Sequence, residues 1–97
     1  MEQSLPTSVL GRTGLEVTRL GYGTAPRKHP DDEQWGRILN GVLDSGINFI
    51  DTSWYYDRSE EFIGRFVSHR RDEYVLATKC GHWWRNDPDT LAGRTRA

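Results

Sequence analysis

A carboxylate, a phenol and an ammonium group follow two apolar runs of this sequence, and together they could deliver a proton. Asp51 lies near the end of the run 48–52, and Tyr56 comes shortly after it. Lys79 follows the run 74–78. An ammonium beside a tyrosine hydroxyl stabilises the phenolate and lowers the pKa of a phenol from its usual ~10. A carboxylate behind the ammonium keeps it charged, so the combination suits a general acid that protonates a carbonyl oxygen.

The same residues also fit a purely structural role. An Asp-Thr pair at the end of a strand often caps a turn, and a single lysine in such a place is usually solvated. The aromatic run Trp54-Tyr55-Tyr56 could equally pack within the fold. Residue types and spacing therefore leave the catalytic and the structural interpretation open.

Other reactive residue types lack the spacing that a site would need. Residues 21–26 hold two glycines, but Pro26 takes the place of the third glycine of a dinucleotide fingerprint. A close approach of a ligand to this backbone and a tight strand exit fit equally well. Cys80 is the sole cysteine, and such a residue is more often packed than reactive, although Lys79 could favour its thiolate. The histidines show no metal-ligand spacing, so we expect no metal site.

Composition limits the classes of function. The chain has 97 residues, and 13 Lys and Arg against 14 Asp and Glu give a net charge of -1. This balance creates no field that would attract nucleic acid or an anionic membrane. The beginning of the chain lacks a signal-peptide pattern, and no apolar run approaches the roughly 18 residues of a membrane helix. With a single cysteine, the sequence predicts a soluble, cytoplasmic protein.

Local patterns predict a hairpin over residues 8–18, around a loop with glycines at 11 and 14, and an extended run over 19–24. A capping box of Asp31 and Gln34 then begins a helix, and Gly46 suits its left-handed end. The apolar stripe of this helix consists of Trp35, Ile38, Leu39, Val42 and Leu43.

A strand over 48–52, a second helix and a strand over 74–78 follow. Asp57 with Glu60 indicates the start of the second helix. The nearly continuous apolar run 74–78 is typical of a strand that is covered on both faces. The buried stripe of the second helix consists of Phe62, Ile63, Phe66 and Val67.

The predicted order is a hairpin followed by β-α-β-α-β, an α/β fold with parallel strands and right-handed crossovers. Such a unit can begin an open doubly wound sheet or the wall of a barrel, and the spacing does not choose between them. In both architectures ligands bind at the carboxyl ends of the strands. The residues predicted at those ends are Gly23, Thr24, Asp51 and Lys79.

The ordered motifs of this chain resemble those of the aldo-keto reductase family over roughly residues 8–82. The resemblance implies a (β/α)8 TIM barrel, with the hairpin closing its floor and an incomplete set of strands in this chain. It also implies the reduction of aldehydes and ketones to alcohols with NADPH or NADH. The motifs that carry the resemblance are 10–18, 21–24, 48–53, Tyr56, 59–64 and 77–79.

By this resemblance Tyr56 is the general acid, Lys79 makes it a stronger acid, and Asp51 orients and charges Lys79. Gly23 and Thr24 would lie near the nicotinamide of NADP(H) or NAD(H), with Asp51 close to the ribose. The residues in places where the substrate pocket of the family is usually aromatic are Trp54, Tyr55 and Trp83.

The departures from the family concern what the chain lacks. The fourth catalytic residue, a histidine on the following strand, has no counterpart, because His82 belongs to the strand exit after Lys79. A (β/α)8 barrel takes about 250 residues, so we expect 1–97 to be a partial domain that holds a cofactor weakly on its own. Unpaired strand edges favour self-association or complementation by the missing part of the barrel. The alternative is a catalytically inactive remnant or a partner-dependent half-barrel, and residues 83–97 are expected to form a disordered tail.

Overall fold

The computed structural model describes residues 4–25, 30–56 and 58–80. The expectations for Asp57, Trp83 and the tail 83–97 lie outside these residues. Among the described residues, no helix has both the length and the apolar character needed to cross a membrane. In chain order the elements are β1 (Thr7–Val9), β2 (Glu16–Thr18), β3 (Tyr22–Gly23), α1 (Asp32–Asp44), β4 (Phe49–Asp51), α2 (Ser59–Val67), the 3-10 helix η1 (Ser68–Glu73) and β5 (Val75–Ala77).

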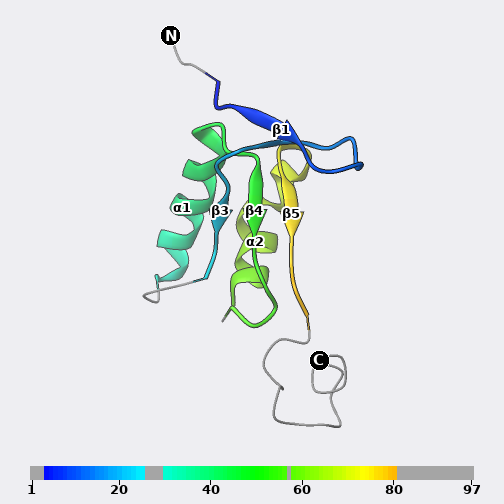
Figure 1. Cartoon of the computed structure of the whole chain (residues 1–97). Coiled ribbons are helices and arrows are strands. Elements are labelled where there is room, and N and C mark those ends of the chain that lie inside the picture. Colours follow the sequence, from blue (N-terminus) through cyan, green and yellow to red (C-terminus); the bar gives the residue numbers. More distant parts are fainter. Residues whose placement is uncertain (1–3, 26–29, 57, 81–97) are drawn as a thin grey trace, which may run out of the picture.

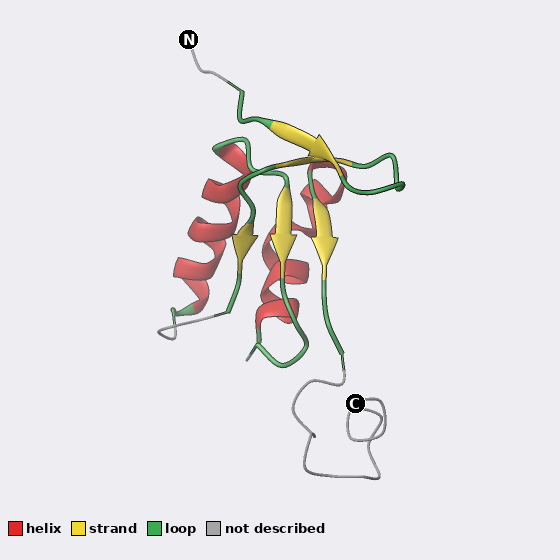
Figure 2. Ribbon diagram, in the orientation of Figure 1, coloured by secondary structure: helices red, strands yellow, loops and turns green. Residues whose placement is uncertain are grey.

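Three strands form a parallel sheet in the order β3-β4-β5, which is also their order along the chain. Both crossover helices therefore lie on the same face of the sheet (Figures 1 and 2), where the rings of Trp35 and Phe62 stack 5.7 Å apart. A doubly wound sheet reverses its strand order and carries helices on both faces. The described topology is instead the kind that a barrel wall requires, which the spacing in the sequence left open.

Helix α1 forms where its apolar stripe predicts it. Leu39 is fully buried, and Trp35 and Leu43 are also buried beneath the helix. The predicted capping box is confirmed, because the Gln34 backbone N–H donates to Asp31 Oδ1 over 2.8 Å and the Asp31 N–H donates to Gln34 Oε1 over 3.0 Å. These bonds satisfy donors that the first turn of a helix leaves open. Gly46 follows with φ 97°, a left-handed conformation that costs glycine little.

The hydrophobic core lies between the helices and the sheet. Phe62, Ile63 and Val67 of the predicted α2 stripe are buried, and they meet Ile50 of β4. Strand β5 differs from the expectation of a strand covered on both faces, because its residues are only half-buried. In the described part of the chain, β5 pairs with β4 alone and the helices cover one face, which explains the difference.

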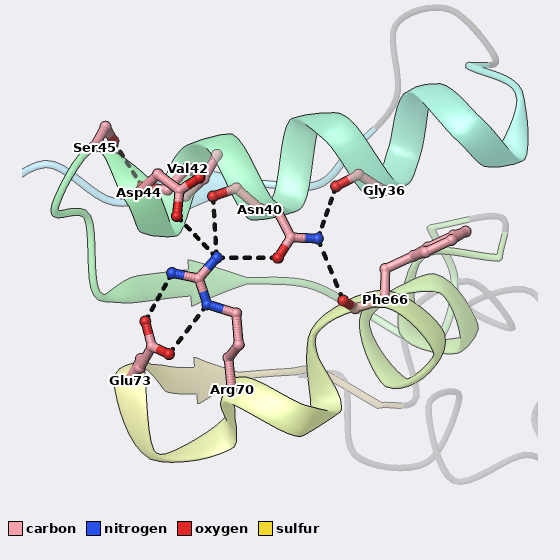
Figure 3. A network of polar contacts seen from close by, with 8 residues as sticks. All are labelled: Gly36, Asn40, Val42, Asp44, Ser45, Phe66, Arg70 and Glu73. Carbon is pink, nitrogen blue, oxygen red and sulfur yellow. Dashed lines mark hydrogen bonds and ion pairs between the residues drawn. The ribbon is translucent and has the colours of Figure 1, made fainter.

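Helix η1 is not apparent from the sequence, because its charged residues show no apolar period and none of them is buried. Arg70 holds it in place (Figure 3). The guanidinium donates to both carboxylate oxygens of Glu73, over 3.1 and 2.8 Å, and to Asn40 Oδ1 over 3.0 Å. It also pairs with Asp44 over 3.0 Å. These contacts connect the segment after α2 to the last turns of α1.

The hairpin of β1 and β2 lies across the amino ends of the three parallel strands (Figure 2). Its loop contains Gly11 and Gly14, both with positive φ. Asn48, which directly precedes β4, binds the hairpin through its side chain. Its Oδ1 accepts from the Thr18 N–H over 2.7 Å and its Nδ2 donates to the Glu16 carbonyl over 2.9 Å. The hairpin is thereby fixed at the end of the sheet opposite to the candidate site.

Candidate active site

The carboxyl ends of the three parallel strands bring the predicted polar residues together. In the register of the sheet, Asp51 stands between Gly23 of β3 and Ala77 of β5. Ile50 is fully buried against the helices. Because side chains alternate along a strand, the side chains of Asp51 and Ala77 point to the other face of the sheet. Lys79 comes two residues after Ala77 and continues the same alternation.

Lys79 reaches across to β4 and binds two groups there. Its Nζ lies 3.0 and 3.1 Å from the two carboxylate oxygens of Asp51. It also donates to the carbonyl oxygen of Thr52 over 2.8 Å. The Lys79 and Asp51 side chains are 44% and 43% exposed, so the pair is open to ligands. This contact spans two strands that are parallel neighbours, as the sequence interpretation required.

Several effects act on the pKa of Lys79. Desolvation lowers this pKa, but the hydrogen bonds and negative charge of Asp51, together with the neighbouring Tyr56, outweigh it, and the pKa is raised above its usual value. An acceptor or an opposite charge beside an ammonium favours its charged form. Lys79 is therefore a cation throughout the neutral range.

Tyr56 returns toward this cation because the chain turns directly after β4. The Tyr56 N–H donates to the Ser53 carbonyl over 3.0 Å, which closes a tight turn. The Tyr56 side chain is half-buried, and the centroid of its ring lies 4.8 Å from Lys79 Nζ. The structure thus brings the predicted phenol, ammonium and carboxylate into one cluster.

Two of the other tyrosines are unsuitable as proton donors. Burial raises the pKa of Tyr22 and of Tyr74 above the usual value for a phenol. The Tyr74 hydroxyl is in addition committed inside the fold, where it donates to the Val67 carbonyl over 3.1 Å. A phenol that is harder to ionise is a poorer acid near neutral pH.

The two residues predicted to contact a cofactor differ in accessibility. Gly23 is exposed, and a Cβ added to it would meet no atom within 4 Å, so the backbone there borders open space beside Asp51. Thr24 is 1% exposed. Its hydroxyl bonds to Thr52 Oγ1 over 2.8 Å and its carbonyl accepts from the Ser59 hydroxyl over 3.1 Å. The side chain of Thr24 is therefore directed into the protein.

The aromatic residues predicted for the substrate pocket lie on the turn that carries Tyr56. Trp54 is half-buried and Tyr55 is 44% exposed. Their rings meet edge to face, with centroids 6.0 Å apart. Trp83 lies outside the described residues. Cys80 is exposed directly after Lys79.

Sequence reasoning missed the role of Thr52. Its contribution is a backbone carbonyl oxygen, which every residue has, so the side chain carries no signal for it. An open cavity of about 310 Å³ also escaped prediction, and it lies at the hairpin end of the molecule, between Leu5, Thr18 and Asn48. We assign the candidate site to the strand ends instead, because there an accessible carboxylate, an ammonium and a phenol ring lie together.

Comparisons with known proteins identify a family. A family model described as the aldo/keto reductase family matches residues 19–94. The chain is 38% identical to D-threo-aldose 1-dehydrogenase from Pseudomonas sp. over 84 residues, which cover 78% of this chain and 25% of that protein. It is 36% identical to pyridoxal 4-dehydrogenase from Microbacterium luteolum, with 89% of this chain and 26% of that protein covered.

A solved structure is also similar. It is described as that of an aldo-keto reductase from Pseudomonas aeruginosa, and it superposes with a TM-score of 0.70 at 42% identity. The match covers 77% of this chain and 31% of that protein. The chain spans about a quarter of the length of the curated relatives it matches.

Proposed function

Because the chain belongs to the aldo/keto reductase family, we propose that it forms the first part of a barrel that reduces aldehydes or ketones to alcohols. The observation that carries this proposal is the cluster at the strand ends. Asp51 and Lys79 are paired at 3.0 Å, and the Tyr56 ring lies 4.8 Å from the same ammonium. An exposed pair of this kind typically contributes only about 0–1 kcal/mol to stability. A role for the Asp51–Lys79 pair in the reaction therefore explains it better than a contribution to folding stability.

Tyr56 is the proposed general acid, which donates the hydroxyl proton to the carbonyl oxygen of the substrate. Lys79 stabilises the phenolate that remains, because its ammonium is held charged beside the ring. Asp51 binds the ammonium through both carboxylate oxygens, over 3.0 and 3.1 Å. The proton from Tyr56 and a hydride at the carbonyl carbon together yield the alcohol. A solvent proton then restores the phenol.

A nicotinamide dinucleotide, when bound, supplies the hydride for this reaction. Among the described residues, the backbone at Gly23 offers room for the nicotinamide ring. The exposed backbone of Gly23 borders open space next to Asp51, so a flat ring could approach it without meeting a side chain. We propose that Gly23 and Asp51 border the nicotinamide ribose end of NADPH or NADH. The exposed Tyr55 and its neighbour Trp54 would line the approach of a carbonyl substrate.

The proposed barrel also accounts for the hairpin. Apolar side chains on and beside it are largely exposed in the described part of the chain, and they are Val9, Leu10, Leu15 and Leu20. Exposed apolar side chains gathered in one region indicate a surface that is covered in the complete assembly. We propose that the hairpin closes the floor of the barrel and that later strands cover these side chains.

A chimera tests this function directly. Residues 19–80 would replace the corresponding segment of the Pseudomonas aeruginosa aldo-keto reductase, and NADPH oxidation would be followed with a simple aldehyde. Tyr56→Phe removes the proton donor with little change in volume, and we expect the turnover of the chimera to fall by about 10²–10⁴-fold. Tyr74→Phe is the matched control, because it removes a phenol hydroxyl that donates to the Val67 carbonyl away from the site, and it should retain most of the turnover.

Two results would contradict the proposal. Unchanged turnover in the Tyr56→Phe chimera would mean that another group is the acid. A folded chimera without any turnover would favour the second candidate, a non-catalytic remnant or a half-barrel that persists by pairing with a partner chain. The exposed apolar side chains around the hairpin are the observation behind that second candidate.

A further inference from the structure

Three buried hydroxyl groups lie directly beneath the Asp51–Lys79 pair, and neither the charges nor the phenol account for them. They belong to Thr24, Thr52 and Ser59, each of which is 1% exposed. The residues come from three different segments: the end of β3, the end of β4 and the start of α2. Burying a hydroxyl costs free energy unless it is hydrogen-bonded, and valine would fill the space of threonine without that cost. A purely apolar layer would therefore serve packing at least as well.

The hydroxyl groups form one connected set. Thr24 Oγ1 bonds to Thr52 Oγ1 over 2.8 Å, and the Ser59 hydroxyl donates to the Thr24 carbonyl over 3.1 Å. The Thr24 N–H donates to the Asp51 carbonyl over 3.0 Å. Through these bonds the ends of β3 and β4 are held to each other and to α2.

Thr52 is the residue on which these contacts converge. Its N–H donates to the Ala77 carbonyl of β5 over 2.8 Å, while its hydroxyl bonds to Thr24. With the N–H and the side chain both fixed, the remaining polar group of the residue has little freedom. That group is the carbonyl, which accepts from Lys79 Nζ over 2.8 Å, a shorter distance than those to the Asp51 oxygens.

The carbonyl matters because of how an ammonium group is built. Lys79 has three N–H donors on a flexible four-carbon stem. Both oxygens of the Asp51 carboxylate and the Thr52 carbonyl lie within hydrogen-bond distance of its Nζ. These three acceptor atoms fix the place of the ammonium, and the ring centroid of Tyr56 lies 4.8 Å from Nζ. The Thr52 carbonyl belongs to the backbone, so it gives the ammonium a fixed point that the Asp51 side chain alone does not supply.

We propose that Thr52 is a positioning residue: the buried Thr24–Thr52 hydroxyl pair holds the Thr52 carbonyl against Lys79 and thereby directs the ammonium toward Tyr56. The effect of this arrangement on catalysis rests on the proposed function. The contact between Thr52 and Lys79 can be tested by a titration of Lys79 that needs no enzymatic activity. Thr24 then serves the site through Thr52 and has no need to touch a ligand.

The test uses the two lysines of the chain, Lys28 and Lys79. In the complete 97-residue chain labelled with ¹³C at lysine Cε, a pH titration by NMR reports both amines, and Lys28→Arg assigns them. Thr52→Val removes the hydroxyl with little change in shape. We expect it to lower the pKa of Lys79 toward the usual value, because a hydrogen bond to the charged form is weakened.

Matched variants separate positioning from general loss of stability. Tyr74→Phe removes another buried hydroxyl, which donates to the Val67 carbonyl far from the site, and it should leave the pKa of Lys79 unchanged. Thr52→Ser keeps the hydroxyl and should retain the raised pKa. If Thr52→Val fails to fold, Thr24→Val removes the partner of the same hydrogen bond and takes its place.

The two proposals fail in different ways. An unchanged Lys79 pKa in folded Thr52→Val, or in Thr24→Val in its place, overturns the positioning role whatever the chimera does. A lowered pKa supports it even where the chimera is inactive. In an active chimera, Thr52→Val is expected to reduce kcat by about tenfold, for a shift of about 1.4 kcal/mol, and to leave KM unchanged. A change in KM alone would contradict the assignment.

Discussion

The Lys79 cluster at the strand ends and the Arg70 cluster between α1 and η1 are both built around a cation, yet their surroundings differ. Arg70 is 18% exposed and donates to Glu73, Asp44 and Asn40, all of which are acceptors (Figure 3). Lys79 is 44% exposed, and a phenol ring lies beside it in addition to its acceptors. A cation surrounded by acceptors joins segments, whereas a cation shared with a phenol leaves a group that can exchange a proton.

The comparison shows that neither the number of charges nor their burial identifies a site. The more buried and better connected cluster is the structural one. The geometry of the guanidinium explains part of this, because its planar fork matches carboxylate oxygens two at a time. An ammonium is a compact charge on a flexible stem, so its direction must come from the groups around it.

The largest expected effect separates the two clusters by activity. Lys79→Met removes the cation beside Tyr56 and should reduce turnover of the chimera by about 10²-fold or more, because the phenolate is no longer stabilised. The melting temperature of the 97-residue chain should change little, since the pair is exposed. A large fall in melting temperature with full activity would reverse the roles that we assign to the two clusters.

Arg70→Met should have the opposite effect. It leaves Glu73, Asp44 and Asn40 without their shared donor, so the melting temperature should fall by several degrees while turnover of the folded chimera is retained. Arg37→Met is the matched control, because Arg37 forms an exposed pair with Glu33 over 3.3 Å, within one helix. Equal melting temperatures for the two variants would show that the Arg70 cluster does not hold η1 to α1.

The smallest effect is a difference in pH dependence. The Arg70 hydrogen bonds lower the pKa of Glu73 below its usual 4.5. The contribution of that pair to stability is therefore present above pH 4.5 and is lost as the pH falls through the folded-state pKa. The raised pKa of Lys79 gives a contribution that is present below its usual 10.5 and is lost as the pH rises through the raised value.

Thermal melts across pH check this difference. The gap between the unchanged chain and Arg70→Met should close at acid pH, whereas any gap to Lys79→Met should close at alkaline pH. Gaps that close together at one end of the pH scale would mean that the two clusters are not independent.

Local features of the fold were predictable because they depend on neighbouring residues. The capping box of Asp31 and Gln34 and the stripe that buries Leu39 act within a few turns, and both are present. Helix η1 was not predictable, because it depends on Arg70 reaching Asn40, 30 residues away in the chain. The half-buried state of β5 also depended on which elements cover it and not on its apolar residues.

The candidate site also has a part that the sequence could predict and a part that it could not. Asp51, Tyr56 and Lys79 could be chosen by residue type and by their places after apolar runs. Their approach to one another could only be expected, because it requires two parallel strands in register and a turn at Ser53. The Thr52 carbonyl could not be chosen at all, since a backbone group has no signature in the side-chain sequence.

The amino-acid sequence by itself determined the order of strands and helices, the residue types at the strand ends and the family. Hydrophobic periodicity, helix caps and family motifs each depend on residues that are close together in the chain. Only the tertiary structure decided that both helices share one face of the sheet, that Lys79 meets Asp51 across 28 residues, and that a buried hydroxyl pair stands beneath them. Those features are contacts between distant segments, and such contacts arise only when the strands pair and the helices pack.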